Sequence, residues 1–178
     1  MMFFAGWLLH SIRLAVALSL ALLAMQAPAL TREYEAALLQ LVRGSEQEIA
    51  QRKASAERFY GFATSADEDR FLAQLRSVEP SNAETLAAAL DRQRGLRASH
   101  SRIEHSPDLL RPLIAAKDVI ENRGGPGRQI AETALESFAP QLDLSFAAAV
   151  YGLVGLFLGS LLAELLVAAL LPRNRLAQ

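Results

Sequence analysis

The sequence contains no cysteine, which excludes disulfides, thiolate metal sites and cysteine nucleophiles. Basic residues are not in excess either, because 18 Lys and Arg residues stand against 19 Asp and Glu residues. Between residues 31 and 143 lie 15 of the basic and 18 of the acidic side chains, so this middle segment has a net charge of −3. A surface that neutralises nucleic-acid phosphates needs a basic stripe, and we therefore expect no nucleic-acid partner.

Motifs that indicate an enzyme or a metalloprotein are also missing. The glycines at 124, 125 and 127 form a loop signal, but neither the preceding strand nor the Gly-Lys-Ser/Thr ending of a phosphate-binding loop accompanies them. His100 and His105 are five residues apart, whereas zinc-binding helices carry histidines at positions i and i+4. No nucleophile elbow is present. We therefore expect no enzymatic activity, no cofactor and no metal site.

Apolar residues are abundant and gather at the two ends of the chain. The sequence is 52% hydrophobic with a mean hydropathy of +0.18. Residues 3–30 and residues 144–171 are each long enough for a helix of about 20 residues to cross the hydrocarbon core of a bilayer. We expect a transmembrane helix in each stretch, with the lipid bilayer around both, a middle domain at 31–143 and a short tail at 172–178.

The N-terminal stretch has a second interpretation, a cleaved signal peptide. Leu14 to Met25 fits its apolar core, and Ala27-Pro28-Ala29 resembles a small-residue cleavage site. The residues before Arg13 are themselves apolar, however, where a signal peptide has a short basic leader. Trp7 also suits the aromatic belt at a membrane boundary. These features favour a retained anchor, with the signal peptide as the alternative.

The positive charges beside the apolar stretches predict their orientation. Arg173 and Arg175 follow the second stretch closely, which favours the cytoplasmic side for that end. Arg13 lies toward the N-terminal half of the first stretch, whereas Arg32 on its other flank is offset by Glu33. We expect both termini in the cytoplasm and the middle domain across the membrane.

Helical periodicity runs through the middle domain. Its first helix, at residues 31–62, carries an apolar seam at Tyr34, Leu38, Leu41, Ile49, Ala56 and Phe59. Four more helices are expected at 66–77, from a capping box at Ser81-Asn82-Ala83-Glu84 through Ile103, from Ser106-Pro107 to Glu121, and at 128–138. The predicted fold is an all-α membrane protein, in which two transmembrane helices flank an extracytoplasmic antiparallel helical domain.

The second apolar stretch carries a stripe of small residues. Gly152, Gly155, Gly159 and Ala163 recur every three or four positions and so share one helix face. Gly155 and Gly159 form a Gly-xxx-Gly pair, which lets another helix approach closely. The helix that covers this face is the first span, a second copy of the chain or another protein.

Glu164 is the only charged residue in the second stretch, where an unpaired carboxylate is costly. Along a helix it lies roughly 28 Å from Ser145. Measured back from Ala29, Arg13 lies roughly 24 Å and His10 roughly 28 Å along the first helix. In an antiparallel hairpin the three side chains have similar depths, and we expect Glu164 to pair with Arg13 or His10.

Two segments resemble a family of small two-pass proteobacterial inner-membrane proteins that is known only as a domain of unknown function. They are Gln26-x-Pro28-x-Leu30 followed by Tyr34 and Leu38, and Glu136-Ser137-Phe138-Ala139-Pro140 followed by Leu144-Ser145-Phe146. One departure is Leu142-Asp143, where a proline-containing break is expected. The resemblance implies an inner-membrane location with a periplasmic helical domain, and it implies no activity.

The sequence favours a structural or accessory subunit of a larger membrane assembly, because it combines a helix-contact face with no catalytic motif. The partner is then either a second copy or another membrane protein. The alternative is a periplasmic sensing or ligand-binding module. Few residues follow Leu171, so such a module would act through a membrane partner. A membrane enzyme or transporter would need oligomers to form a substrate path.

Overall fold

The computed structural model describes residues 2–62, 67–122, 126–139 and 145–170, and within these ranges every regular element is an α-helix. The helices are α1 (Met2–Met25), α2 (Ala27–Tyr60), α3 (Glu68–Val78), α4 (Pro80–Glu104), α5 (Arg111–Glu121), α6 (Pro126–Ser137) and α7 (Phe146–Leu170). The all-α prediction is confirmed. The predicted tail at 172–178, with Arg173 and Arg175, lies outside the described residues, as do Gly124, Gly125 and Leu142-Asp143.

The chain divides into two compact units. We call the first the terminal unit; it comprises the described residues of Met1–Arg32, Asp108–Pro112 and Ser137–Gln178. We call the second the middle unit; it comprises those of Glu33–Pro107 and Leu113–Glu136. The sequence pattern did not indicate that the short segment Asp108–Pro112 belongs with the terminal helices.

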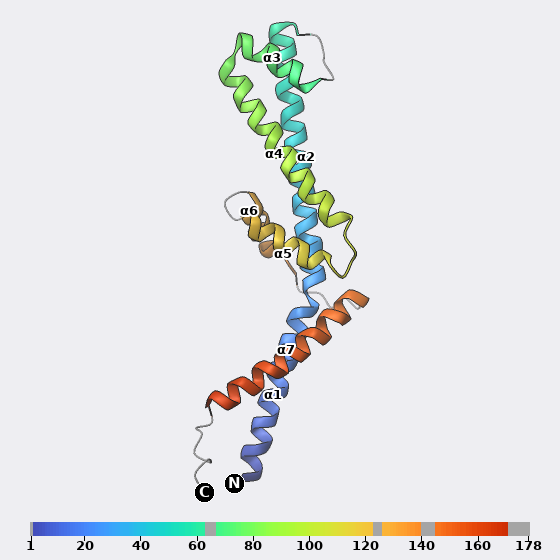
Figure 1. Ribbon diagram of the computed structural model, residues 1–178, viewed down its shortest axis with the longest axis vertical. Coiled ribbons are helices and arrows are strands. Elements are labelled where there is room, and N and C mark those ends of the chain that lie inside the picture. Colours follow the sequence, from blue (N-terminus) through green and yellow to red (C-terminus); the bar gives the residue numbers. More distant parts are fainter. Residues whose placement is uncertain (1, 63–66, 123–125, 140–144, 171–178) are drawn as a thin grey trace. The chain divides into compact units, whose positions relative to one another are not determined.

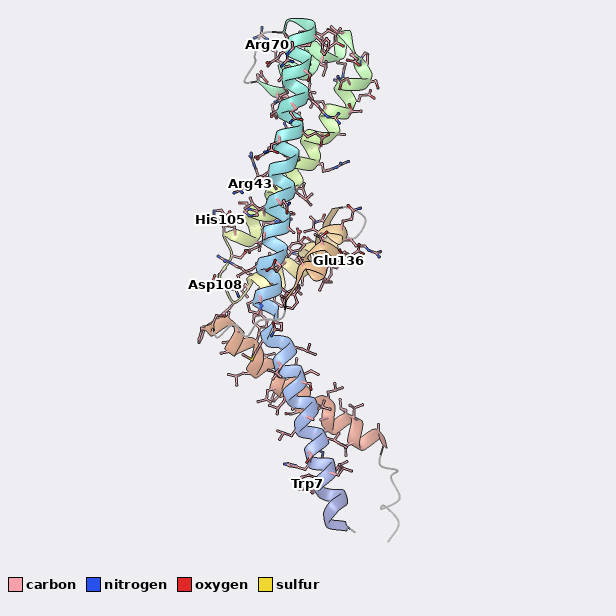
Figure 2. All side chains as sticks on the ribbon, turned by 180° about the vertical axis from the view of Figure 1, so that it is seen from behind. Trp7, Arg43, Arg70, His105, Asp108 and Glu136 are labelled. Carbon is pink, nitrogen blue, oxygen red and sulfur yellow. The ribbon has the colours of Figure 1, made fainter. Side chains whose placement is uncertain are left out.

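Within the described parts of the chain, two helices are long and apolar enough to cross a membrane. One begins at Trp7 near the N-terminus, and the other is Phe146–Ala169 in α7. Only 6% of the first apolar window and 28% of the second are buried inside the protein, unlike the core helix of a soluble domain. Figure 2 shows that the side chains along α1 and α7 are mostly carbon, with Trp7 near the N-terminal end of α1.

The terminal unit is built on the crossing of α1 and α7 (Figure 1). The pairing is antiparallel, because Gly152 faces Met25 whereas Gly159, about two turns further along α7, faces Ala17. At Gln26 the first helix is interrupted for one residue, and α2 begins at Ala27. Pro28 lacks an N–H and cannot continue the α-helical hydrogen bonds of α1, which explains a break at this point. The Leu30 amide then bonds to the Gln26 carbonyl at 2.9 Å and re-establishes the helix.

The middle unit has two apolar clusters along α2. The first joins Tyr34, Leu38 and Val42 to residues of α4, α5 and α6, and the second joins Ile49 and Ala56 to residues of α3 and α4. The predicted seam is therefore confirmed at Tyr34, Leu38, Ile49 and Ala56. It is wrong at two positions, because Leu41 is 44% and Phe59 83% exposed. Val42 is buried in place of Leu41, so the buried face of α2 differs from the predicted seam by one residue at this point.

Two predicted helix starts are wrong. The capping box at Ser81 is not used, since α4 begins at Pro80 with Glu79 as the preceding residue. Proline suits the first helical position because its missing N–H has no partner there anyway. The helix predicted from Ser106-Pro107 begins only at Arg111, after turns at residues 108–110. Asp67 is the N-cap of α3, and its carboxylate accepts from the Asp69 amide at 3.1 Å.

Candidate functional site

The small-residue face of α7 lies against α1. Gly152, Gly155, Gly159 and Ala163 are all buried, although most of the surrounding α7 side chains are exposed. A Cβ atom at Gly155 would lie 2.6 Å from the Ala24 Cβ and 2.6 Å from the Leu20 carbonyl oxygen. A Cβ atom at Gly159 would lie 2.8 Å from the Ala17 Cα. Of the three candidate partners for this face, it is the first helix of the same chain that covers it. The helices can approach closely because glycine has no side chain.

The three polar residues singled out within the apolar stretches do not all meet. Arg13 Nη2 lies 3.2 Å from Glu164 Oε2 and forms an ion pair between α1 and α7. The two side chains are 34% and 62% exposed, so the pair lies at the edge of the helix contact. His10 is exposed, and no hydrogen bond or ion pair between His10 and Glu164 occurs among the described residues. Of the two expected partners of Glu164, it is therefore Arg13 that the fold brings to it.

The outward surface of the same two helices is bulky and apolar. On α7 the exposed large apolar side chains are Phe146, Leu153, Val154, Phe157, Leu158, Leu161, Leu162, Leu165 and Leu166. On α1 they are Trp7, Leu8, Ile12, Leu14, Leu18, Leu22 and Leu23. Small residues thus face inward and large apolar ones outward, the reverse of the usual distribution in a water-soluble helical pair.

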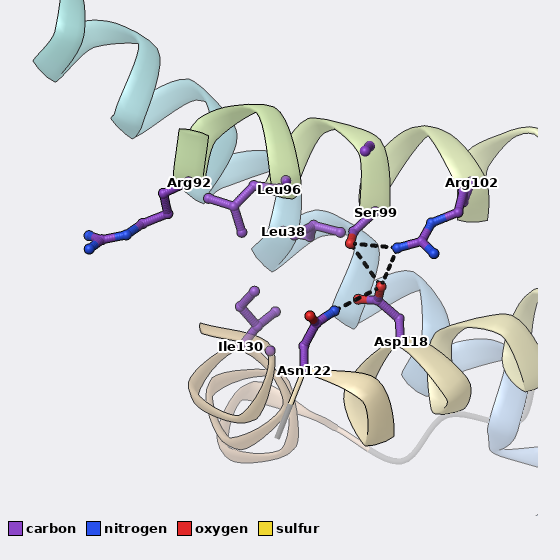
Figure 3. A pocket seen from close by; sticks show the side chains of 11 residues that line it. Leu38, Arg92, Leu96, Ser99, Arg102, Asp118, Asn122 and Ile130 are labelled. Carbon is purple, nitrogen blue, oxygen red and sulfur yellow. Dashed lines mark hydrogen bonds and ion pairs between the residues drawn. The ribbon is translucent and has the colours of Figure 1, made fainter. Parts of the chain in front are cut away.

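The middle unit contains a buried polar cluster around Asp118 of α5. The Asp118 side chain is 5% exposed and accepts hydrogen bonds from four side chains. Oδ2 accepts from the Tyr34 hydroxyl at 2.8 Å, and Oδ1 accepts from the Ser99 hydroxyl at 2.8 Å. Oδ1 also accepts from Arg102 Nη2 at 3.0 Å and from Asn122 Nδ2 at 3.1 Å (Figure 3). The carboxylate thus links α2, α4 and α5.

Tyr34 acts as a donor in this cluster. Burial raises the pKa of its phenol above the ordinary value of 10, and the hydrogen bond to the Asp118 carboxylate raises it further. The hydroxyl therefore stays protonated at any physiological pH. With the four donors around it, the carboxylate has few acceptor positions left for a substrate proton. The geometry suits a structural tie between helices better than general base catalysis.

A cavity of about 310 Å³ opens beside the cluster. Leu38, Leu96 and Ile130 form an apolar side, and Ser99, Asp118 and Asn122 form a polar side. Figure 3 shows Ser99 and Arg102 reaching from α4 toward Asp118, while Arg92 extends away from the cluster. The cavity has the size and mixed lining of a small-molecule site.

Sequence reasoning missed this cluster. Tyr34 was assigned to the apolar seam of its helix, and its partner lies 84 residues away along the chain. One local signal existed: Asp118 shares a helix face with the buried Ala115, so an acidic residue interrupts an apolar stripe. His100 and His105 have different partners, since His100 Nδ1 lies 3.5 Å from Glu104 Oε2 and His105 Nδ1 bonds to the Ser101 carbonyl. No group of three or more potential metal ligands occurs in the described ranges.

Comparison with known proteins gives one result. No curated protein and no solved structure matches the chain. Residues 8–176 match the family described as "Protein of unknown function (DUF2937)". The match extends through the α1–α7 pair, the Asp118 cluster and nearly all of the sequence. The chain therefore belongs to this family of unknown function.

Proposed function

We propose that this protein is a two-span protein of a bacterial inner membrane and serves as a structural or accessory subunit of a larger membrane assembly. The observation that carries the membrane part is the inverted packing of the terminal unit. Its small residues lie between α1 and α7, and its leucines and phenylalanines point outward. Lipid tails are the environment in which such an outward surface is stable.

The same packing supports a retained first span over a cleaved signal peptide. Gly155 and Gly159 are in close contact with Leu20, Ala24 and Ala17 of α1. Removal of α1 would leave the small-residue face of α7 uncovered and Glu164 without Arg13. Both changes are unfavourable within a bilayer.

Exposed apolar side chains on the middle unit support the assembly part. Leu113 and Ile120, seven residues apart on α5 and so on one helix face, are 60% and 56% exposed. Leu135 on α6 is similarly exposed. Contact with a protein partner would remove these side chains from water.

Orientation can be tested by labelling, because the chain has no cysteine of its own. We expect Ser77→Cys, in the middle unit, to react with a membrane-impermeant maleimide added to cells whose outer membrane alone is permeabilised. Gln178→Cys should react only after the inner membrane is opened. The reverse pattern would contradict the proposed periplasmic position of the middle unit, and labelling of both without permeabilisation of the inner membrane would contradict two spans.

The assembly is tested by the mass of the tagged chain in copolymer nanodiscs taken directly from membranes. We expect a discrete species well above the 19.4 kDa of one chain, with a partner in fixed stoichiometry. Replacing Leu113 and Ile120 together by Glu should release the partner. Gln129→Glu, an exposed polar position on α6, is the matched control and should not. A monomer in native membranes would overturn the proposal.

A second candidate function is the binding of a small molecule by the middle unit. The cavity beside Asp118 favours it, because an apolar side and a polar side face one space. Native mass spectrometry of the full-length protein should then show a retained small molecule. Ala98→Phe, at an exposed residue that lines the cavity, should abolish its retention. A ligand-free wild-type spectrum would argue against this function.

A further inference from the structure

We propose that the turn at Asp108–Pro112, which lies between the two spans in the sequence, enters the surface of the lipid bilayer and forms a third membrane contact. This inference rests on the proposed membrane spans and adds a lipid-binding surface to them. The segment belongs to the terminal unit, although it lies in the middle of the sequence. Leu109 and Leu110 at its centre are 37% and 47% exposed.

A direct bond holds this turn to the second span. The Tyr151 hydroxyl of α7 donates to the Leu109 carbonyl at 2.7 Å. Residues 108–110 form turns that precede α5, and they are not part of a helix. Near hydrocarbon, an irregular backbone is tolerated only where its polar groups are bonded. The tyrosine supplies that bond for Leu109.

The position of Tyr151 along α7 sets the depth of the turn. The 25 residues of α7 extend over roughly 37 Å, which exceeds a hydrocarbon core of about 30 Å by a few ångströms at each end. Tyr151 is five residues, or roughly 7 Å, from the start of α7, close to the boundary between tails and headgroups. Tyrosine is enriched at this boundary because its ring is apolar and its hydroxyl is polar.

The order of residues in the turn suits the same boundary. Asp108 and Arg111 flank the two leucines and form an ion pair at 3.4 Å. Leu109 and Leu110 can thus enter the upper acyl region while the charged side chains stay among the headgroups. Lipid is the partner that this surface fits, since Tyr151 bonds the turn to α7, whose exposed side chains are largely apolar.

Tryptophan quenching by brominated lipids tests the depth of the turn. The single tryptophan, Trp7, is first replaced by Phe, and Leu110→Trp is introduced in the full-length chain. In phosphatidylcholine vesicles brominated near the top of the acyl chains, Leu110→Trp should be quenched about twofold more than Phe59→Trp, an exposed control near the end of α2. Adding Tyr151→Phe, which keeps the ring and removes the hydroxyl, should weaken this quenching.

A third position separates this inference from the proposed function. Leu158→Trp, on the outward face of α7, should be quenched most by bromines deep in the acyl chains. If Leu158→Trp is quenched and both Leu110→Trp and Leu109→Trp are not, the spans stand and the third contact is wrong. If Leu158→Trp is not quenched either, the proposed spans are wrong. Shielding of Leu110→Trp from aqueous acrylamide without lipid quenching would assign the turn to a protein partner and overturn the lipid contact.

Discussion

The two units hold their helices together in opposite ways. In the terminal unit, α7 has glycines at the helix contact. Because glycine has no side chain, Gly155 lies close to the backbone of α1 at Leu20. In the middle unit, large side chains fill the contact, with Phe71, Leu75, Leu86 and Leu90 almost fully buried. Burial of leucine and phenylalanine stabilises helices in water, whereas in lipid it brings little gain and close packing takes over. The difference is the one expected if lipid surrounds the terminal unit, as proposed, and water surrounds the middle unit.

Their acidic side chains differ in the same sense. Asp118 is buried and accepts bonds from four side chains, whereas Glu164 forms an ion pair with Arg13 at the edge of its helix contact. A carboxylate that is buried on folding needs hydrogen-bond or ion-pair partners within the protein. Glu164 is 62% exposed in the protein alone, and only a surrounding bilayer would make its pairing important.

The largest effect is expected at Asp118. Asp118→Ala removes the shared acceptor and leaves the buried hydroxyls of Tyr34 and Ser99 without a partner, which should destabilise the middle unit by about 2–4 kcal/mol. Urea unfolding followed by circular dichroism measures the loss. Asp91→Ala, at an exposed acid of α4, is the control and should change stability by about 0.5 kcal/mol or less. Equal effects of the two variants would show that the cluster contributes no special stability.

A graded loss is expected along the glycine face. Gly155→Ala places a Cβ against a backbone oxygen and should cost about 2–3 kcal/mol. Gly152→Ala meets mainly the Met25 side chain, which can rotate away, and should cost under about 1 kcal/mol. Thermal unfolding in mild detergent, followed by the fluorescence of Trp7, compares them. A larger loss at Gly152 than at Gly155 would contradict the close approach of α1 at Leu20.

Tyr34→Phe should reveal a pH dependence confined to the middle unit. Because the folded-state pKa of Tyr34 is raised above about 10, the unfolded chain loses this proton first as the pH rises. The stabilisation is complete below about pH 10 and declines above it, by up to about 1.4 kcal/mol per pH unit. Tyr34→Phe should cost about 1–2 kcal/mol at neutral pH and flatten this decline. If the free energy of unfolding of Tyr34→Phe declined at high pH as steeply as that of the wild type, Tyr34 would not be the cause of the decline.

A smaller, environment-dependent effect is expected at the ion pair between Arg13 and Glu164. Glu164→Gln leaves Arg13 without its partner and should lower stability in bilayers by about 1 kcal/mol, with recovery in the double variant Arg13→Gln, Glu164→Gln. Steric-trap or denaturant unfolding in vesicles measures both. His10→Gln is the control, since His10 forms no hydrogen bond or ion pair with Glu164 among the described residues. Unchanged stability and cellular level in Glu164→Gln would show that the pair does not stabilise the hairpin.

The smallest effect has the opposite sign. Gly44 lies in the middle of α2, and a Cβ atom there would meet nothing within 4 Å. Gly44→Ala should therefore stabilise the middle unit by about 0.5–1 kcal/mol through its higher helix propensity. Urea unfolding measures whether the free energy of unfolding rises or falls. Set beside Gly155→Ala, it separates a glycine that permits helix contact from one that has no steric role.

The sequence by itself determined the helical class, the two apolar stretches and the small-residue stripe. These follow from local periodicity and composition, which a single helix expresses without any partner. It also indicated Arg13 as a partner of Glu164, because 1.5 Å per residue fixes the depth of each side chain along an antiparallel pair. It erred at Leu41, Ser81 and Ser106-Pro107, where neighbouring segments decide which face is buried and where a helix starts.

Only the tertiary structure decided which helix covers the glycines, that Tyr34 meets Asp118, and that the turn at Leu109 joins the terminal unit. These contacts join residues far apart in the chain, and many alternative pairings fit the same local pattern. The selection comes from the simultaneous fit of side-chain volumes and hydrogen-bonding groups across helices. Periodicity along one helix carries no information about that fit.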